Sequence, residues 1–225
     1  WWDHWMKGRE TGIMEEPALR LFMQDHAPPA GFHAERAGRW VAEPAWPSPN
    51  ISRTRFGLGA CGGLARDRTR LAEGTRRIRS PVFSGAAAGK WCSYAVPGDQ
   101  PVDQRIDDGG ALVFETAPLA DPHEIAGDPA AELVLSVDRP VAQVAVRLSD
   151  VAPDGRATRV SYGVLNLTHR DGHAAPEPLE PGRRYTVRVP MKVVAQHFRA
   201  GHRIRLSVSS NYFPMIWPAP EPVEI

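Results

Sequence analysis

Hydrophobic and polar residues alternate with a period of two in several short segments of this chain. Between Asp103 and Val151 the apolar positions are Leu112 and Phe114, then Leu133, Leu135 and Val137, then Val144, Val146 and Leu148. This period is typical of strands with one face on a core and the other in water. Turn residues precede each segment, at 107–110, 126–129 and 138–140. Short strands with short connections predict antiparallel neighbours in a β-sandwich or barrel.

The alternation continues on both sides of this stretch. It predicts strands over residues 17–24 and 51–56, a strand pair or one long bent strand over 156–168, and strands at 185–189 and 202–209, with Ile204, Leu206 and Val208 inward. Val193 to Phe198 is too short for an independent helix and is predicted as a helical turn. About eight strands result, which suits an all-β jelly roll.

Two long segments show no such alternation. Residues 25–50 carry five prolines and are predicted as a loop, with Trp40 and Trp46 as buried aromatic residues that hold it in place. Residues 64–80 are predicted as an arginine-rich loop with weak structure.

The first eight residues predict the end of a helix. Trp1 and Trp5, like Trp2 and Met6, are four positions apart, Asp3 and Lys7 form an i,i+4 ion pair, and Gly8 suits the C′ position. Exposed tryptophans are unfavourable, so this helix is expected to pack against another layer. It either docks on its own domain or is the last helix of a preceding domain, and the composition favours neither.

Composition narrows the class of protein. The 225 residues include 20 glycines and 22 prolines, which suits a turn-rich β protein large enough to bury a core. The net charge of +1 gives no reason to expect nucleic acid or an anionic membrane as a partner. No apolar run approaches the roughly 20 residues of a membrane helix. Cys61 and Cys92 could pair or remain free, so the compartment stays undecided, with the cytoplasm favoured over secretion.

Most candidate chemical motifs lack the flanking elements or the residues that their function requires. Residues 57–62 match G-x-G-x-x-G, but without a flanking strand and helix a glycine-rich hairpin is the better interpretation. Residues 85–90 resemble a phosphate loop, yet Trp91 stands where Ser or Thr must hold magnesium. No G-x-S-x-G nucleophile elbow is present. His169 and His173 fall in a charged turn, so we predict a solvated loop, no metal site and no cofactor.

A family resemblance is carried by motifs spread in order along most of the chain. They are Asp3–Gly8, Glu16-Pro17, Trp46-Pro47, Asp103–Asp108, Leu112–Leu119, Ile125–Gly127, Val151–Arg156, Gly163–Leu165, Leu179–Gly182 and Phe198–Ser210. In these the chain resembles the C-terminal domain of the serine hydrolases that include X-prolyl dipeptidyl-peptidase, cocaine esterase and the α-amino-acid ester hydrolases. Residues 57–90 do not match the pattern confidently.

The resemblance implies a galactose-binding-like jelly roll that follows an α/β-hydrolase domain. Residues 1–16 would be the tail of that domain and residues 17–225 the jelly roll. The catalytic residues would all lie upstream, so the chain should be inactive alone. Its partners would be the upstream domain and, in the parent, a small acyl ester or peptide substrate, and a homodimer of the parent is compatible. The alternative is an autonomous carbohydrate- or protein-binding module.

Two groups of residues stand out within this frame. In the resembled family the loop with Lys90, Trp91, Cys92 and Tyr94 lies where the jelly roll meets the active site, so these residues are candidate substrate-binding residues. Glycine followed by a large aromatic residue suits such a loop. A core position for Trp91 is the alternative and is slightly favoured.

The second group is the acidic turn before the Leu112 strand. Asp103, Arg105, Asp107 and Asp108 are predicted to form a structural corner in which carboxylates hold Arg105 through specific charged hydrogen bonds. General acid–base chemistry is the rejected alternative.

Overall fold

The structure is a computed structural model that describes residues 1–94 and 96–225. Its helical segments are short: α1 (Trp2–Lys7), α2 (Arg105–Asp108) and the 3₁₀ turns Ile13–Glu15, Arg68–Arg70 and Leu167–His169. Its strands are β1 (Leu19–Gln24), β2 (Gly38–Glu43), β3 (Gly57–Leu58), β4 (Leu64–Ala65), β5 (Leu112–Glu115), β6 (His123–Gly127), β7 (Ala130–Leu135), β8 (Gln143–Val151), β9 (Ala157–Asn166), β10 (Tyr185–Pro190), β11 (Val194–Phe198) and β12 (Arg203–Ser209). The chain is therefore predominantly β, as predicted.

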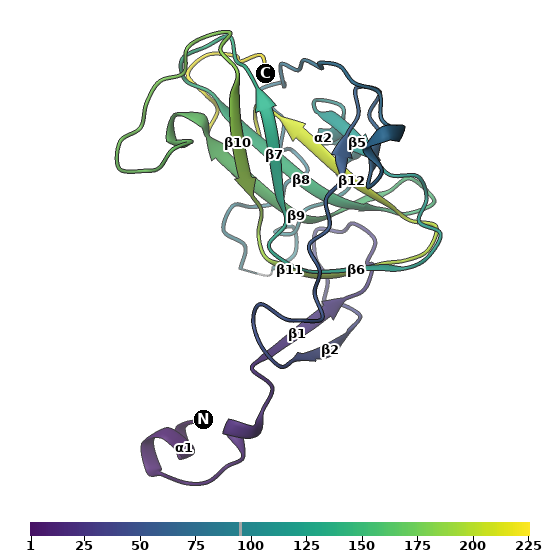
Figure 1. Cartoon of the computed structure of the whole chain (residues 1–225), viewed down its shortest axis with the longest axis vertical. Helices are drawn as coiled ribbons and strands as arrows, with labels where there is room; N and C mark the ends of the chain where they lie inside the picture. The colour runs from purple at the N-terminus through teal and green to yellow at the C-terminus, as the bar shows by residue number, and fades with distance from the viewer. Residues whose placement is uncertain (95) are drawn as a thin grey trace.

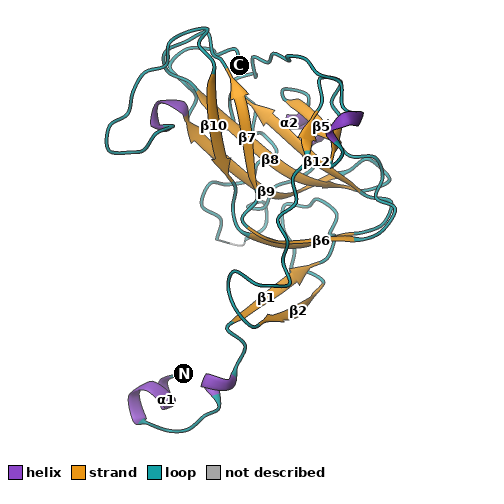
Figure 2. Cartoon of the chain, in the orientation of Figure 1, coloured by secondary structure: helices purple, strands orange, loops and turns teal. Residues whose placement is uncertain are grey.

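The strands form a jelly-roll β-sandwich around a central antiparallel sheet with the order β5-β12-β8-β9. The antiparallel pair β7 and β10 packs in front of β8 and β9 (Figures 1 and 2). A second sheet has the order β2-β1-β11-β6 and lies at one end of the sandwich (Figure 1). The glycine-rich motif forms the β3–β4 hairpin, which confirms the prediction for residues 57–62.

The main core lies on one face of the central sheet. Val144, Val146 and Leu148 of β8 pack there against side chains from β7, β10 and β11, including Leu135, Val187, Val189 and Phe198. Full burial of each such side chain stabilises the fold by about 1.5–3 kcal/mol. This apolar face is the one that the alternation predicted, and the inward orientation of Ile204, Leu206 and Val208 is likewise confirmed.

The segment 156–168 forms one long strand, β9, rather than a strand pair. Its register with β8 shifts between Leu148 and Ser149, where a bulge bends the two strands together. Every residue of β8 is buried, on both faces, so the central sheet is covered on each side.

Several local predictions were wrong. The predicted loop over 25–50 contains β2, which pairs along its whole length with β1. Residues 51–56 form no strand, and pairing starts only at Gly57. Val194–Phe198 is strand β11 rather than a helical turn, because β6 supplies an antiparallel partner. Strand β6 itself was also missed, since its pairing with β11 is not visible in the local pattern.

The prediction for Trp40 and Trp46 was also wrong. Both are exposed, Trp40 at 71% and Trp46 at 51% of their surface. Trp40 contacts Phe22 of β1 edge to face, at 5.4 Å between ring centroids, but nothing covers its other side within the described residues.

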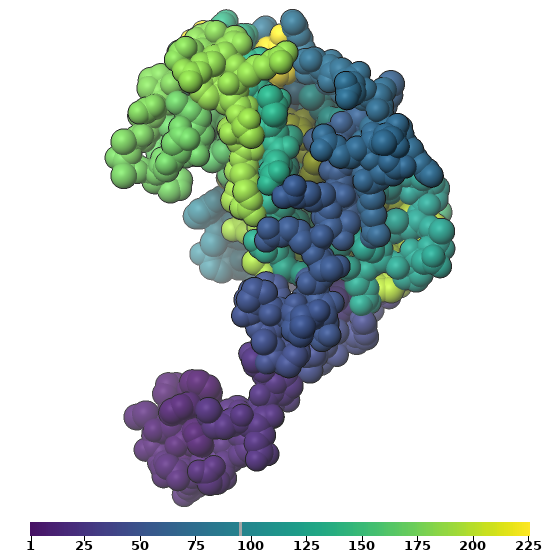
Figure 3. All heavy atoms as spheres, viewed as in Figure 1, coloured from purple at the N-terminus to yellow at the C-terminus, as the bar shows by residue number. Residues whose placement is uncertain are grey.

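The N-terminal helix forms as predicted. Gly8 adopts a left-handed conformation and closes α1, Lys7 pairs with Asp3 at 2.6 Å, and the tilted rings of Trp1 and Trp5 lie 5.6 Å apart. The helix projects away from the sandwich as a separate lobe (Figure 3), and no residue of α1 is buried. Among the described residues, no helix is long and apolar enough to cross a membrane.

Candidate functional site

Two glycines precede the candidate loop at positions where a side chain would clash with neighbouring backbone. Gly85 has φ 113°, and a Cβ there would lie 1.8 Å from the Phe213 carbonyl oxygen. Gly89 has φ 73°, and a Cβ there would lie 2.4 Å from the backbone carbonyl oxygen of Asp99. A side chain at either position would clash at these distances. Residues other than glycine also rarely adopt the left-handed backbone conformation. The backbone of residues 85–89 is therefore pressed onto the sandwich, with Ala87 and Ala88 fully buried.

Asp99 closes the base of the loop. The Lys90 ammonium lies 2.7 Å from its carboxylate, and the Tyr94 backbone N–H donates to the same group at 2.8 Å. The hydrogen bond from Lys90, followed by that from Tyr94, holds the pKa of the Asp99 carboxyl below its usual value. Lys90 therefore has a structural role through its ion pair with Asp99.

The tip of the loop is open to solvent. Trp91 is 70% exposed, Tyr94 is 82% exposed, and Cys92 is exposed and free. The core alternative for Trp91 is therefore wrong, because the packed loop base at Ala87 and Ala88 directs the tip outward. Cys61 is also free and exposed, so the two cysteines do not pair.

Other apolar residues lie near this loop. Trp91 lines a surface hollow together with Tyr162, Met191, Lys192 and Met215. The 82–94 segment also pairs with the segment that follows β12, since the Phe213 N–H donates to the Ser84 carbonyl at 2.8 Å. Exposed apolar side chains from both segments are Val82, Phe83, Phe213 and Trp217. We call them, with Trp91 and Tyr94, the exposed apolar group.

The predicted acidic corner is arranged differently from expectation. Among the described residues Arg105 forms an ion pair with Asp103 only, through its Nε at 2.9 Å and Nη2 at 2.6 Å, and it is half exposed. Burial raises the pKa of Asp103, but the hydrogen bonds from Arg105 and from backbone N–H groups outweigh it, so the net pKa is lowered. Asp107 and Asp108, on α2, face inward instead.

Their partner is Arg147 on the second face of β8. Its guanidinium is 1% exposed and lies 2.9 Å from Asp108 and 3.7 Å from Asp107. Asp107 also accepts the backbone N–H groups of Gly85 and Ala87, at 2.8 and 3.1 Å. This cluster, which sequence reasoning missed, therefore fixes the base of the candidate loop to the central sheet.

A second arginine extends the cluster along β12. Arg205 bridges Asp108 at 2.7 Å and Glu115 at 2.5 Å, and Arg203 also pairs with Glu115. Burial raises the pKa of Glu115, but the hydrogen bonds from Arg203 and Arg205 outweigh it and bring the pKa below its usual value. Glu115 therefore serves as an ion-pair partner of the two arginines.

Tyr212 completes this buried polar layer. It is fully buried, donates to Gln104 Oε1 at 3.2 Å and accepts from Arg159 at 2.7 Å. Burial raises the pKa of its phenol. Gln104 donates in turn to the carbonyl of Ala87 at 2.8 Å, another contact to the loop base. We call the Arg147 side of β8, with its partners, the polar face.

One cluster has the composition of a metal site. His26, Asp150 and His202 place ligand atoms within 4.8 Å of one another. Each carboxylate oxygen of the buried Asp150 lies 2.8 Å from one imidazole Nδ1, so hydrogen bonds account for both oxygens. The cluster joins the segment after β1 to β8 and to the turn that precedes β12. The prediction of no structural metal stays a prediction. His169 and His173 lie in an exposed turn.

Comparison with known proteins identifies the class of this fold. A family model described as the X-Pro dipeptidyl-peptidase C-terminal non-catalytic domain matches residues 11–225. The chain therefore belongs to that family, the non-catalytic C-terminal domains of serine hydrolases that include esterases and peptidases.

Particular relatives agree. The chain is 29% identical over 223 residues to cocaine esterase of Rhodococcus sp., covering 94% of the chain and 37% of that protein. It superposes on an aminopeptidase of a marine Thaumarchaeota archaeon with a TM-score of 0.73, at 22% identity, covering 98% of the chain and 37% of the other. For a hydrolase of Staphylococcus aureus the TM-score is 0.72 at 13% identity, covering 99% and 41%. The chain thus spans little more than a third of its relatives.

Proposed function

We propose that this chain stabilises the catalytic domain of a serine hydrolase and that its Lys90–Tyr94 loop forms part of the wall of that active site. The observation that carries the proposal is the combination of a firmly held loop base with an exposed aromatic tip. The polar face binds the backbone at Gly85 and Ala87, yet Trp91 and Tyr94 lie in solvent. A loop that is held at its base and presents uncovered aromatic rings suits contact with another surface.

The N-terminal helix supports the same view. Trp1, Trp2, Trp5 and Met6 are each more than half exposed, on a helix that no part of the sandwich covers. Such a concentration of exposed apolar surface is unusual for a solvated element and favours an interface. We propose that residues 1–16 pack with the upstream hydrolase domain and that residues 17–225 form the jelly roll.

The proposed role is structural and steric rather than chemical. The parent would cleave an ester or an amide, which includes a peptide bond after proline, with nucleophile, base and oxyanion donors supplied upstream. The chain alone is expected to leave p-nitrophenyl esters and Xaa-Pro anilides intact. Turnover that a serine-directed phosphonate abolishes, in a preparation free of contaminants, would contradict this role.

The two free cysteines provide a direct test of the loop position in the parent. Cys92 lies in the candidate loop and Cys61 lies on the β3–β4 hairpin, and both are exposed. A bulky phosphonate on the catalytic serine should slow alkylation of Cys92 by a maleimide and leave Cys61 unaffected, as mass spectrometry of each peptide would show. Equal rates at Cys92 with and without the phosphonate would contradict the proposal.

An autonomous carbohydrate- or protein-binding module is the second candidate. The exposed apolar group is the observation in its favour. Sugar rings can stack on exposed aromatic side chains, just as a second domain can pack against them. Glycan binding by the chain, lost in Trp91→Ala, would support this candidate instead.

A further inference from the structure

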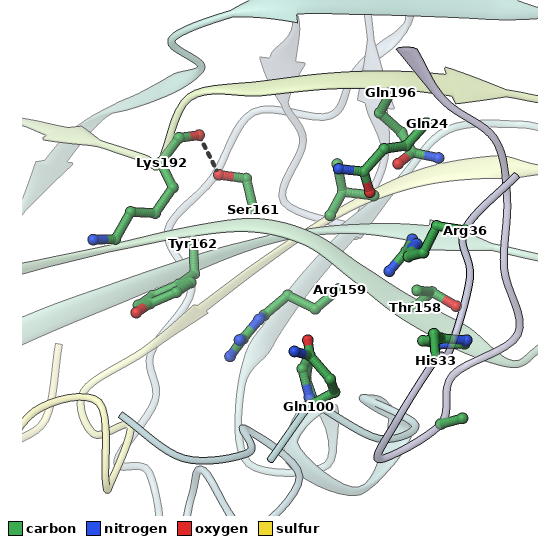
Figure 4. A pocket seen from close by; sticks show the side chains of 13 residues that line it. Gln24, His33, Arg36, Gln100, Thr158, Arg159, Ser161, Tyr162, Lys192 and Gln196 are labelled. Atoms are coloured by element: carbon green, nitrogen blue, oxygen red, sulfur yellow. Dashed lines mark hydrogen bonds between the residues drawn. The ribbon is translucent and has the colours of Figure 1, made fainter. Parts of the chain in front are cut away.

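A polar pocket lies beside the candidate loop, at the junction of β9, β11 and the segment that connects β1 to β2 (Figure 4). Its cavity volume is about 190 Å³. Arg36, Arg159 and Lys192 contribute cationic side chains to its lining, together with His33. None of the residues that line it carries a carboxylate.

Arg36 is the group that the fold does not explain. It is partly buried, and within the described residues its side chain has no hydrogen-bond acceptor and no ion pair, with a buried Nε that lacks any partner. The other arginines whose side chains lack an acceptor are all exposed, namely Arg9, Arg53, Arg55, Arg68 and Arg184. Burial lowers the pKa of Arg36, as expected for a cation without a counter-ion. Buried charges in proteins are normally paired.

Of the other two cations, Arg159 is held by hydrogen bonds and Lys192 lies near an aromatic ring. Arg159 donates to the Ala88 carbonyl at 2.9 Å and to Tyr212, and its guanidinium lies over the Tyr162 ring at 4.5 Å. Lys192 lies 5.9 Å from the same ring. Neither forms an ion pair with any described residue. Figure 4 shows Arg36, His33 and Thr158 on one side of the pocket, Lys192 and Tyr162 on the other, and Arg159 between them.

The loop that supplies Arg36 is held in place by a set of tertiary contacts. Asp25 pairs with Arg199 at 2.6 Å, His26 with the buried Asp150 at 2.8 Å, and the Ala27 carbonyl accepts from Thr158 at 2.8 Å. The Gly31 carbonyl accepts two backbone N–H groups, from Gly98 and Gln100. The unpaired guanidinium is thus kept in the pocket by the fold rather than left there by a free loop.

We propose that this pocket binds the carboxylate of a small organic acid. Arginine offers the fork of donors that a carboxylate accepts, and the neighbouring uncompensated cations increase the attraction. The pocket shares Tyr162 and Lys192 with the hollow that Trp91 lines. If the proposed function holds, the acid is the acyl product of the parent or an acidic substituent of its substrate, and this part of the inference rests on that function.

The test is a calorimetric titration of the 225-residue chain with benzoate, and with benzamide as its uncharged isostere, at ionic strength matched with NaCl. Saturable binding of benzoate without binding of benzamide is expected. Arg36→Gln should weaken benzoate binding by at least about tenfold, the usual effect of a lost charged hydrogen bond. Arg36→Lys should retain part of the affinity. The matched control Arg53→Gln removes an exposed, unpaired arginine outside the pocket and should leave binding unchanged.

Thermal unfolding separates this role from a purely structural one. Arg36→Gln should leave the Tm of the free chain unchanged or raised, because it removes a buried charge without a partner. A clearly lowered Tm, or equal binding of benzoate and benzamide, would overturn the proposal.

The source of the carboxylate is tested in the parent. Benzoate that binds the chain but not the parent would show that the upstream part covers or fills the pocket, and it would overturn the small-molecule proposal. The Cys92 protection experiment is independent of this pocket, so failure of the proposed function and failure of the carboxylate site give different results.

Discussion

The two faces of strand β8 are stabilised by different kinds of interaction. Val144, Val146 and Leu148 are buried among apolar side chains of β7, β10 and β11, and area removed from water stabilises that face. One residue away, Arg147 is equally buried but lies among carboxylates, Gln104 and Tyr212. The apolar face tolerates many side chains of similar volume, whereas the polar face demands particular partners. The first maintains the sandwich, and the second positions the loop that carries Trp91.

Arg147→Met should give the largest effect and distinguish the two faces. It leaves Asp107 without a cationic partner in a buried site, and the loss of one member of a buried ion pair costs about 3–5 kcal/mol. Leu148→Ala on the apolar face should cost about 2–5 kcal/mol by cavity formation. Hydrogen exchange should increase at residues 85–99 in Arg147→Met alone. Equal exchange in both variants would contradict a separate role for the polar face.

The next largest effect is expected in the pH dependence of stability, through the carboxylate of Glu115. Glu115 has a lowered pKa in the folded state, so its contribution is fully present above its unfolded value of 4.5 and is lost as the pH falls toward the folded pKa. Denaturant unfolding should therefore show a loss of stability below about pH 4.5. Glu115→Gln should flatten that part of the curve. A wild-type curve that is already flat there would refute this assignment.

Arg105→Lys should give a smaller effect. Arg105 lies at the surface, where its ion pair with Asp103 is half exposed, and exposed ion pairs contribute about 0–1 kcal/mol. The melting temperature should fall slightly, by far less than in Arg147→Met. A loss of stability as large as that of Arg147→Met would show that Arg105, rather than Arg147, is the main cationic partner of these carboxylates.

Removal of metal should have no effect. The hydrogen bonds of His26 and His202 satisfy both oxygens of Asp150, which leaves no need for an ion. Dialysis against EDTA should leave the melting temperature unchanged, and metal analysis should find no stoichiometric ion. A bound zinc ion with a lowered Tm after its removal would overturn the prediction.

The sequence predicted the apolar face well and the polar face poorly. Strict alternation identified β5, β7, β8, β10 and β12, because one face of each strand packs on the core. The same rule assigns Arg147 to solvent, because the groups that cover it, Asp107, Asp108 and Tyr212, lie outside the strands. Strands β6 and β11 were missed because their pairing is set by each other rather than by local propensity.

The candidate site shows the same limit. Gly89 and Trp91 marked a loop with an apolar tip, but the burial of its base depends on Asp107 and Gln104, which are distant in sequence. Asp107 was noticed and assigned to the wrong arginine. Arg36 carried no signal at all, because an unpaired buried cation can be recognised only when the partners around it are known.

The central claim, that the Lys90–Tyr94 loop walls a hydrolase active site, is tested most directly by Trp91→Ala in the full-length parent enzyme. Because Trp91 is 70% exposed in the chain, stability should change by no more than about 0.5 kcal/mol. Loss of an apolar contact with the substrate should lower kcat/KM by about tenfold, chiefly through KM, or narrow the range of acyl groups accepted. Val134→Ala, an exposed apolar position on β7, is the control. Unchanged kinetics for every acyl group in Trp91→Ala, with the enzyme fully folded, would contradict the claim.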